Sequence, residues 1–258
     1  MVFPKKSLGQ HWLHDDETLQ AMCDAVALTP ADTVLEIGPG LGTLTSKLVK
    51  QAGQVIAVEL DPQLARALPK RVPAANLRVV QQDILKFNFV SLPSGYKLAA
   101  NIPYYLTSNL LRLISEMPND FSIAALLVQK EVAERVCARP GAMSLLSVGV
   151  QFYSEVSLGA VVPAELFTPP PKVDSQILVL HHRPAPLFPD VDERVFFRVV
   201  KAGFAQRRKT LLNSLSAGLQ LDRVAALALL EQANIEPNTR AQNLDLNEWY
   251  RLYKIHNS

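Results

Sequence analysis

The sequence predicts an α/β domain built on a parallel sheet, followed by a small all-α C-terminal domain. Short β-branched runs alternate with helical patterns from residue 33 to about residue 128, the order typical of βαβ units. These runs are apolar throughout rather than alternating, as expected when both faces of a sheet are covered. Beyond a proline-rich break near residue 184, every segment has a helical pattern. We therefore expect one domain over residues 1–183 and a second over residues 184–258.

The expected elements follow in chain order. Strands are predicted over residues 33–37, 54–60, 77–81, 98–100 (the end of a fourth strand) and 123–128. Helices are predicted over residues 43–51, after Asp61-Pro62, and after the fifth strand. Residues 156–162 and 173–180 are expected to form an antiparallel pair at one edge of the sheet. The last part is expected to contain helices at 190–204, 208–217, 221–233 and 245–254.

Composition bounds the class of protein. The chain has 258 residues, of which 48% are hydrophobic and 19% charged, so it can bury a core and is not disordered. The apolar stretches are too short for a membrane span. The two cysteines, Cys23 and Cys137, have no partners that would form a metal site or a disulfide framework, and the histidines lack metal-ligand spacing. We expect a reduced cytoplasmic protein without a metal.

A glycine-rich turn, Glu36 to Gly42, stands between the first strand and its helix. Glycines such as Gly38 and Gly40 let the backbone approach a ligand at the helix N-terminus. Glu59 ends the second strand, where a carboxylate can accept hydrogen bonds from ribose hydroxyls. A dinucleotide site would want a glycine where Thr43 stands, so the pattern fits S-adenosylmethionine better than NAD.

Asp83 follows the third strand and has two interpretations. Its carboxylate can accept a hydrogen bond from the exocyclic amine of the cofactor's adenine. It can equally cap a helix or turn.

The segment Asn101-Ile102-Pro103-Tyr104 follows the fourth strand, at the edge of the sheet where ligands bind. An adenine amine is a poor nucleophile because its lone pair is delocalised into the ring. The Asn101 side-chain carbonyl and the Ile102 backbone carbonyl can accept its two N–H bonds and free that lone pair. Pro103 stiffens the turn, and Tyr104 can stack on the base. This chemistry is orientation plus electrostatics, without a strong base.

Several segments, in order along almost the whole chain, closely resemble the ribosomal RNA adenine dimethyltransferases. The resemblance is strongest to the small-subunit KsgA/RsmA family, which has eukaryotic and archaeal counterparts. The segments are residues 5–13, 36–42, 101–104, 129–132, 167–175 and 206–215.

The resemblance implies a Rossmann-like, class I S-adenosylmethionine-dependent methyltransferase domain. Such enzymes add two methyl groups to N6 of each of two adjacent adenosines, in a hairpin near the 3′ end of 16S rRNA within an immature 30S subunit. It also implies that Phe167 stacks on the target base opposite Tyr104, whereas by itself Phe167 suggests a hydrophobic loop anchor. The implied cofactor contacts fall on His11, Leu13, Gly38, Glu59, Asp83 and Asn101.

Basic residues are the candidates for RNA contacts. Arg207, Arg208 and Lys209 fall in a stretch, residues 198–209, that has no acidic residue, although net charge is only +2. Lys130 and Arg135 are further candidates that can instead pair with acids on the same helix. Lys5 and Lys6 complete the set, with plain solvation as their alternative.

Two positions depart from the family's usual pattern. The family usually has Asn-Phe where this chain has His11-Trp12, and the bacterial enzymes commonly have Asn where this chain has Tyr105. We expect cofactor binding to survive the first change. Bulk at Tyr105 could alter how many methyl groups are added.

Three other functions stay open from the sequence. One is an erythromycin-resistance methyltransferase of 23S rRNA, which shares the Asn101–Tyr104 pattern, and another is a non-catalytic 30S assembly factor. A small-molecule methyltransferase or NAD enzyme would give no reason for a basic helical domain. We expect a monomer, because no coiled coil or similar interface pattern is present.

Overall fold

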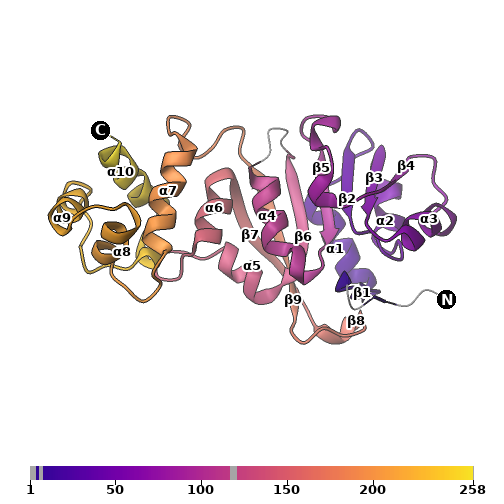
Figure 1. Ribbon diagram of the computed structural model, residues 1–258. Helices are drawn as coiled ribbons and strands as arrows, with labels where there is room; N and C mark the ends of the chain where they lie inside the picture. Colours follow the sequence, from indigo (N-terminus) through magenta and orange to yellow (C-terminus); the bar gives the residue numbers. More distant parts are fainter. Residues whose placement is uncertain (1–3, 6–7, 117–120, 258) are drawn as a thin grey trace. The chain divides into compact units, whose positions relative to one another are not determined.

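A seven-stranded sheet is the framework of the computed structural model, which describes residues 4–5, 8–116 and 121–257 (Figure 1). Its strand order is β4-β3-β2-β5-β6-β9-β7, and the first five of these strands are parallel. Strand β9 runs antiparallel between β6 and β7, so the expected antiparallel pair is present at one edge. The strands are β2 (Thr33–Ile37), β3 (Gln54–Glu59), β4 (Leu77–Gln81), β5 (Lys97–Asn101), β6 (Ile123–Gln129), β7 (Ser154–Val162) and β9 (Ser175–His182).

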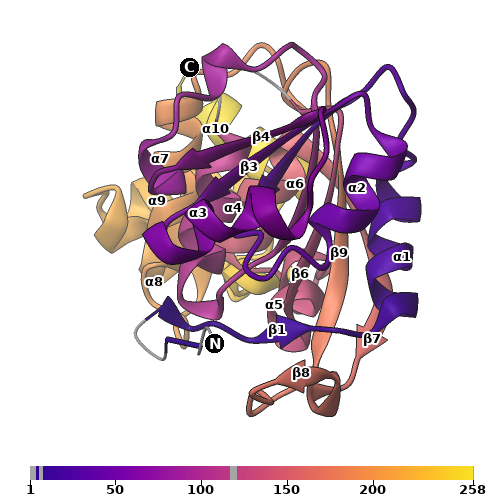
Figure 2. The same cartoon turned by 90° about the vertical axis from the view of Figure 1, so that its right-hand side faces the viewer.

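Helices cover both faces of the sheet, which explains why its central strands are apolar throughout. The helices are α1 (Asp16–Val26), α2 (Thr45–Gln51), α3 (Pro62–Arg71) and α4 (Thr107–Ser115). Met22 of α1 and Leu48 of α2 share one hydrophobic cluster with Ala99 of β5, and Leu68 of α3 packs against Ala57 of β3. Helix α4 lies on the opposite face from α1 (Figures 1 and 2). The α/β architecture with a mostly parallel sheet that the sequence predicted is therefore confirmed.

The sequence did not predict α1 or a second, two-stranded sheet. In that sheet β1 (Trp12–Leu13) pairs antiparallel with β8 (Phe167–Thr168). Each strand is only two residues long, so neither has a pattern that a sequence window could detect. The pairing joins residues 8–13, which we call the strap, to the proline-rich loop that begins at Phe167. This loop contains a cis peptide bond between Thr168 and Pro169.

The chain forms two compact units, residues 1–134 with 154–184 and residues 135–153 with 185–258. The second unit is all helical, as expected of the C-terminal part, and α5 (Lys130–Val136) spans the division. Its helices are α6 (Leu145–Tyr153), α7 (Glu193–Phe204), α8 (Leu211–Gly218), α9 (Arg223–Gln232) and α10 (Leu246–His256).

Residues 135–153 lie in the second unit, although the sequence predicts them in the first domain. Phe152 of α6 stacks on Phe196 of α7, with ring centroids 4.9 Å apart, inside the core of the second unit. An apolar helix joins the core it can bury itself in, whatever its place along the chain. No helix in the described part of the chain is long and apolar enough to cross a membrane.

Candidate active site

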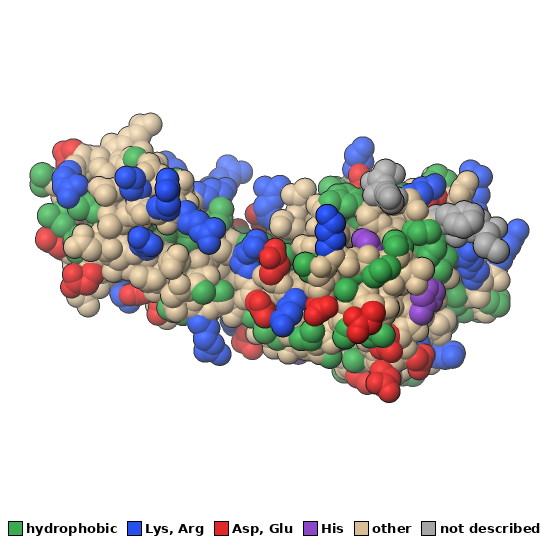
Figure 3. Space-filling model, turned by 90° about the horizontal axis from the view of Figure 1, so that it is seen from below, with side chains coloured by type: hydrophobic (Ala, Val, Ile, Leu, Met, Phe, Trp, Pro, Cys, Tyr) green, Lys and Arg blue, Asp and Glu red, His purple; other side chains and the backbone are tan. Residues whose placement is uncertain are grey.

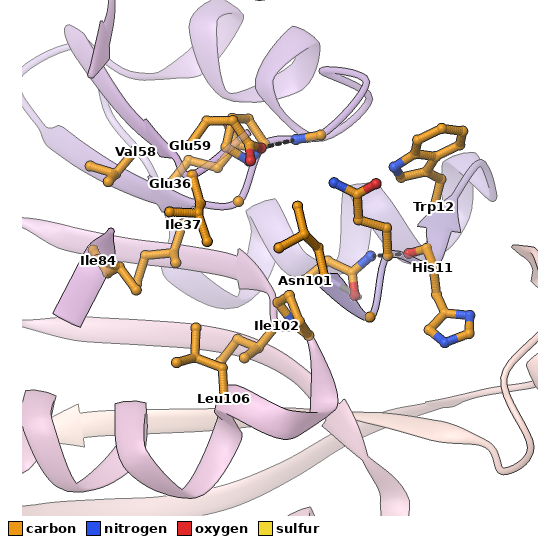
Figure 4. Close-up of a pocket in the computed structure, with 18 of the residues that line it drawn as sticks. His11, Trp12, Glu36, Ile37, Val58, Glu59, Ile84, Asn101, Ile102 and Leu106 are labelled. Atoms are coloured by element: carbon orange, nitrogen blue, oxygen red, sulfur yellow. Dashed lines mark hydrogen bonds between the residues drawn. The ribbon is translucent and has the colours of Figure 1, made fainter. Parts of the chain in front are cut away.

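A pocket lies at the carboxyl ends of the parallel strands, where the strand order reverses between β2 and β5 (Figure 4). Such a switch point is where open α/β sheets bind ligands, because the loops after the two strands leave in opposite directions. The pocket brings together all the residues predicted to bind a cofactor. These are His11, Leu13, Gly38, Gly40, Glu59, Asp83 and Asn101.

The glycine-rich turn after β2 is held against the end of β3. Gly38 and Gly40 have φ angles of +65° and +57°, which side chains other than glycine rarely adopt. The Gly40 N–H donates to Oε2 of Glu59 over 3.1 Å, and the Asp61 N–H donates to Oε1 over 2.9 Å. Each carboxylate oxygen has a second lone pair, so Glu59 is fixed in place and can still accept from a ligand.

Two buried glutamates line the same pocket. Burial raises the pKa of Glu36 to about 8, and the neighbouring charge of Glu59 adds to this shift. Burial also raises the pKa of Glu59, although the backbone N–H groups of Asp61 and Gly40 oppose the shift. In the sequence Glu36 stands only at the start of the glycine motif, and no pattern there predicts it as a site residue.

Asn101 is oriented by the strap. Its Nδ2 donates to the backbone carbonyl of His11 over 3.1 Å, which leaves the side-chain oxygen as the group that can accept from a ligand. The next residue, Ile102, is buried, and its N–H donates to the carbonyl of Leu127 over 3.1 Å. The Pro103 carbonyl accepts from the Leu106 N–H over 2.9 Å and closes the turn.

Tyr104 is anchored at both its hydroxyl and its ring. The hydroxyl is 2.8 Å from the Ser175 hydroxyl at the start of β9. The ring stacks with His11, with centroids 5.7 Å apart and planes 23° apart. Burial raises the pKa of Tyr104 above its ordinary value, so the phenol stays neutral at physiological pH.

Phe167 does not lie where the resemblance implied. Its side chain is only 3% exposed and belongs to the hydrophobic cluster that contains Leu13 and Ile177. The pocket-lining residues, as far as the structure describes the chain, do not include Phe167. The pairing of β8 with β1 turns the ring into the core, and stacking of Phe167 on a target base stays a prediction. Phe167 is the loop anchor that the residues alone suggested.

Apolar walls of the pocket were missed by the sequence analysis. Leu60, which is 45% exposed, directly follows Glu59. Leu85, which is 41% exposed, is separated from Asp83 by Ile84. Their signal was an apolar residue next to each predicted acidic contact. Asp83 caps the short 3-10 turn Ile84–Lys86 through one oxygen, which accepts from the Leu85 N–H over 3.0 Å. Its second carboxylate oxygen is not used by this cap.

The predicted RNA contacts are spread over both units. Lys5 forms an ion pair with the buried Asp61, with Nζ and Oδ2 2.7 Å apart, so its charge is already partnered. Lys6 lies outside the described residues. Lys130 and Arg135 are exposed on α5. Arg207, Arg208 and Lys209 are exposed in the turn between α7 and α8. Basic side chains gather on one face of the helical unit (Figure 3).

Comparison with known proteins gives consistent matches over the whole chain. The family model described as ribosomal RNA adenine dimethylase matches residues 3–258. The ribosomal RNA small subunit methyltransferase A of Dehalococcoides mccartyi is 45% identical over 256 residues, covering 98% of this chain and 88% of that protein.

Two solved structures resemble the fold over nearly its full length. A dimethyladenosine transferase from Plasmodium falciparum has a TM-score of 0.82 at 28% identity, covering 94% of this chain and 96% of that one. The 23S rRNA methyltransferase ErmE has a TM-score of 0.77 at 29% identity, covering 96% and 100%.

Proposed function

The chain belongs to the ribosomal RNA adenine dimethylase family, and on that premise we propose that the pocket at the β2–β5 switch point is its active site. The protein is an S-adenosylmethionine-dependent adenine dimethyltransferase of 16S rRNA. The observation that carries the assignment of the site is Asn101, whose amide nitrogen is tied to His11 so that its oxygen is free to accept.

The residues present fit S-adenosylmethionine. Glu59 is placed to accept from ribose hydroxyls, and the second oxygen of Asp83 to accept from the adenine amine. Leu60 and Leu85 offer apolar surfaces to the flat base. Glu36 also lines the pocket, and its buried Oε2 has no hydrogen-bond partner among the described residues. When bound, the cofactor supplies an electrophilic methyl group.

The chain's own residues orient and activate the target amine. The Asn101 oxygen and the Ile102 carbonyl accept hydrogen bonds from the two N–H groups of the adenine amine. These bonds draw the nitrogen towards a tetrahedral shape and free its lone pair. Tyr104 presents its ring to the target base, and the Ser175 contact fixes the plane of that ring. No strong base is needed, because the amine proton becomes acidic only after the methyl group has been added.

The finer features of the reaction are also part of the proposal. The target is a pair of adjacent adenosines near the 3′ end of 16S rRNA, in an immature 30S subunit, and the enzyme acts as a monomer in the cytoplasm. Arg207, Arg208 and Lys209 hold the RNA backbone, assisted by Lys130 and Arg135. Tyr105, 60% exposed at the pocket rim, leaves room for an amine that already carries one methyl group.

The 23S enzyme is the alternative that most needs testing, because ErmE shares the fold at a TM-score of 0.77. Sequence supports the small-subunit substrate: the relative from Dehalococcoides mccartyi is 45% identical, whereas ErmE is 29% identical.

The deciding experiment is methyl transfer from labelled S-adenosylmethionine to undermethylated 30S subunits, with mature 30S and protein-free 23S rRNA as controls. The nucleosides are then identified by mass. We expect dimethyladenosine in a 3′-terminal 16S fragment. Label in 23S rRNA alone would establish the resistance-type activity instead, and monomethyladenosine alone would show that Tyr105 restricts the product.

A further inference from the structure

The indole of Trp12 presents a buried donor to the active-site pocket. Its Nε1 is inaccessible to solvent and has no hydrogen-bond partner among the described residues. Trp12 lines the pocket, and a Cβ added to Gly40 would lie only 3.4 Å from this nitrogen. Figure 4 shows the nitrogen on the edge of the ring that is turned towards the other lining residues. A buried N–H without a partner is unfavourable, and because Trp12 borders the pocket, a ligand that fills the pocket can supply the missing acceptor.

The other tryptophan of the chain provides a contrast. Trp249 also has an unpartnered Nε1, but its side chain is fully buried in the hydrophobic core of the helical unit. Trp249 is not among the residues that line the active-site pocket, so its indole is an internal reference.

The position of Trp12 along the pocket indicates which part of a ligand it meets. Val58 and Ile84 lie on one side of the pocket, and His11 and Trp12 lie on the other (Figure 4). The proposed adenine contact, Asp83, immediately precedes Ile84. S-adenosylmethionine is a linear molecule, so with its adenine at that side its amino-acid end extends towards the strap. That end carries a carboxylate, which requires hydrogen-bond donors.

The neighbouring His11 cannot meet this requirement in its neutral form. Its Nδ1 is 2.7 Å from the Pro169 carbonyl, and a carbonyl only accepts, so Nδ1 carries the proton. The other ring nitrogen of a neutral histidine is then an acceptor, which would repel a carboxylate. Trp12 is therefore the better-suited side-chain donor of the strap at this position.

We propose that the Trp12 indole N–H binds the carboxylate of the cofactor's methionine portion. The proposal rests on the proposed function, since it takes S-adenosylmethionine as the ligand. Trp12 thereby becomes a cofactor-specificity residue that distinguishes the complete cofactor from analogues without the carboxylate.

The test uses Trp12→Phe, which keeps an aromatic ring against Gly40 but removes the donor together with part of the ring, and the second ligand controls for the lost packing. Two ligands are titrated calorimetrically into the full-length wild type and the variant. One is S-adenosylhomocysteine, and the other is S-adenosyl-3-thiopropylamine, which lacks only the carboxylate. We expect Trp12→Phe to lower the affinity for S-adenosylhomocysteine by about tenfold or more, as for a lost hydrogen bond to a charged group. The affinity for the amine analogue should fall by less than about twofold, within the error of additive behaviour.

Each outcome decides the proposal. Equal weakening of both ligands would show that the indole acts by packing alone, and unchanged binding of S-adenosylhomocysteine would place the carboxylate elsewhere; either overturns it. Failure of the wild type to bind S-adenosylhomocysteine would refute the proposed function itself.

A second measurement uses the wild type alone, so it tests the proposal even if Trp12→Phe does not fold. In 15N-labelled wild type, the Trp12 indole N–H resonance should shift on adding S-adenosylhomocysteine but not the amine analogue, while the Trp249 resonance stays in place. Equal shifts with both ligands, or none with either, would contradict the carboxylate contact.

Discussion

Asn101 shows that the orientation of a pocket amide can depend on a residue far away in sequence. An asparagine side chain can present either its oxygen or its nitrogen to a ligand, and only the hydrogen bonds around it decide which. Here the Asn101 nitrogen donates a hydrogen bond to the His11 carbonyl over 3.1 Å, so the oxygen faces the ligand side. The strap therefore determines which atom a side chain on β5 presents to the pocket.

The first prediction concerns this side chain. Asn101→Ala should lower the rate of methyl transfer to 30S subunits by about 100- to 1,000-fold, as for loss of one positioned group that stabilises developing charge. Affinity for S-adenosylhomocysteine should change much less, because the adenosine contacts are on other strands. Parallel kinetics and calorimetry measure both quantities, and dimethylation at the wild-type rate would refute the role of Asn101.

Glu36 leads to a prediction about pH and stability. Its pKa is raised by burial to about 8, above its ordinary value of 4.5, so the folded protein holds the proton more tightly than the unfolded chain. This contribution to stability is complete below pH 4.5 and is lost as pH rises through about 8. Glu36→Gln, which cannot ionise, should therefore gain in Tm relative to the wild type as the pH increases from 5 to 9.

Differential scanning calorimetry at intervals across that range measures the Glu36 effect. Glu165→Gln, at an exposed position, is the matched control and should keep a constant offset from the wild type. A constant offset for Glu36→Gln as well would mean that Glu36 titrates in its ordinary range.

At the scale of elements, two glycines in helices of the second unit differ in whether helix packing requires them. Gly203 of α7 faces Trp249 of α10, and an added Cβ would lie 2.3 Å from the indole carbon Cη2. Gly149 of α6 has no heavy atom within 4 Å of such a Cβ. The first glycine permits two helices to approach, while the second only weakens its own helix.

We predict opposite effects on stability for these two glycines. Gly203→Ala should destabilise the helical unit by about 1–3 kcal/mol through overpacking against Trp249. Gly149→Ala should stabilise it by about 0.5–1 kcal/mol, because alanine has the higher helix propensity. Denaturant unfolding of both variants compares the same change in two helices of one unit. Equal effects of the two substitutions would show that Trp249 shifts aside without cost.

At the scale of the whole molecule, the catalytic pocket and the basic turn belong to different compact units. The pocket is built entirely from the first unit, and Arg207 and Arg208 are exposed in the second. Cofactor binding and RNA binding can therefore be changed separately.

The last prediction uses this separation. Replacing Arg207 and Arg208 together by alanine should weaken binding to 30S subunits and reduce the slope of log affinity against log salt by about 1–2, as for two lost phosphate contacts. Affinity for S-adenosylhomocysteine should not change. The control replaces Arg66 and Lys70, two exposed basic residues of α3, and should leave the slope nearly unchanged. Equal slopes for both double variants would place the RNA contacts elsewhere.

Local patterns of residues were enough to predict the parallel sheet, the helical C-terminal part and the residues after each strand end. Periodicity and glycine spacing are local properties, and parallel strands necessarily bring their carboxyl ends to one edge, so Gly38, Glu59, Asp83 and Asn101 could be placed together beforehand. Other features became visible only in the folded chain: the strap, the burial of Phe167, the Lys5–Asp61 ion pair and the packing of residues 135–153 with the second unit. These depend on contacts between distant segments, whose free energy comes from burial and pairing that no local pattern of residues records.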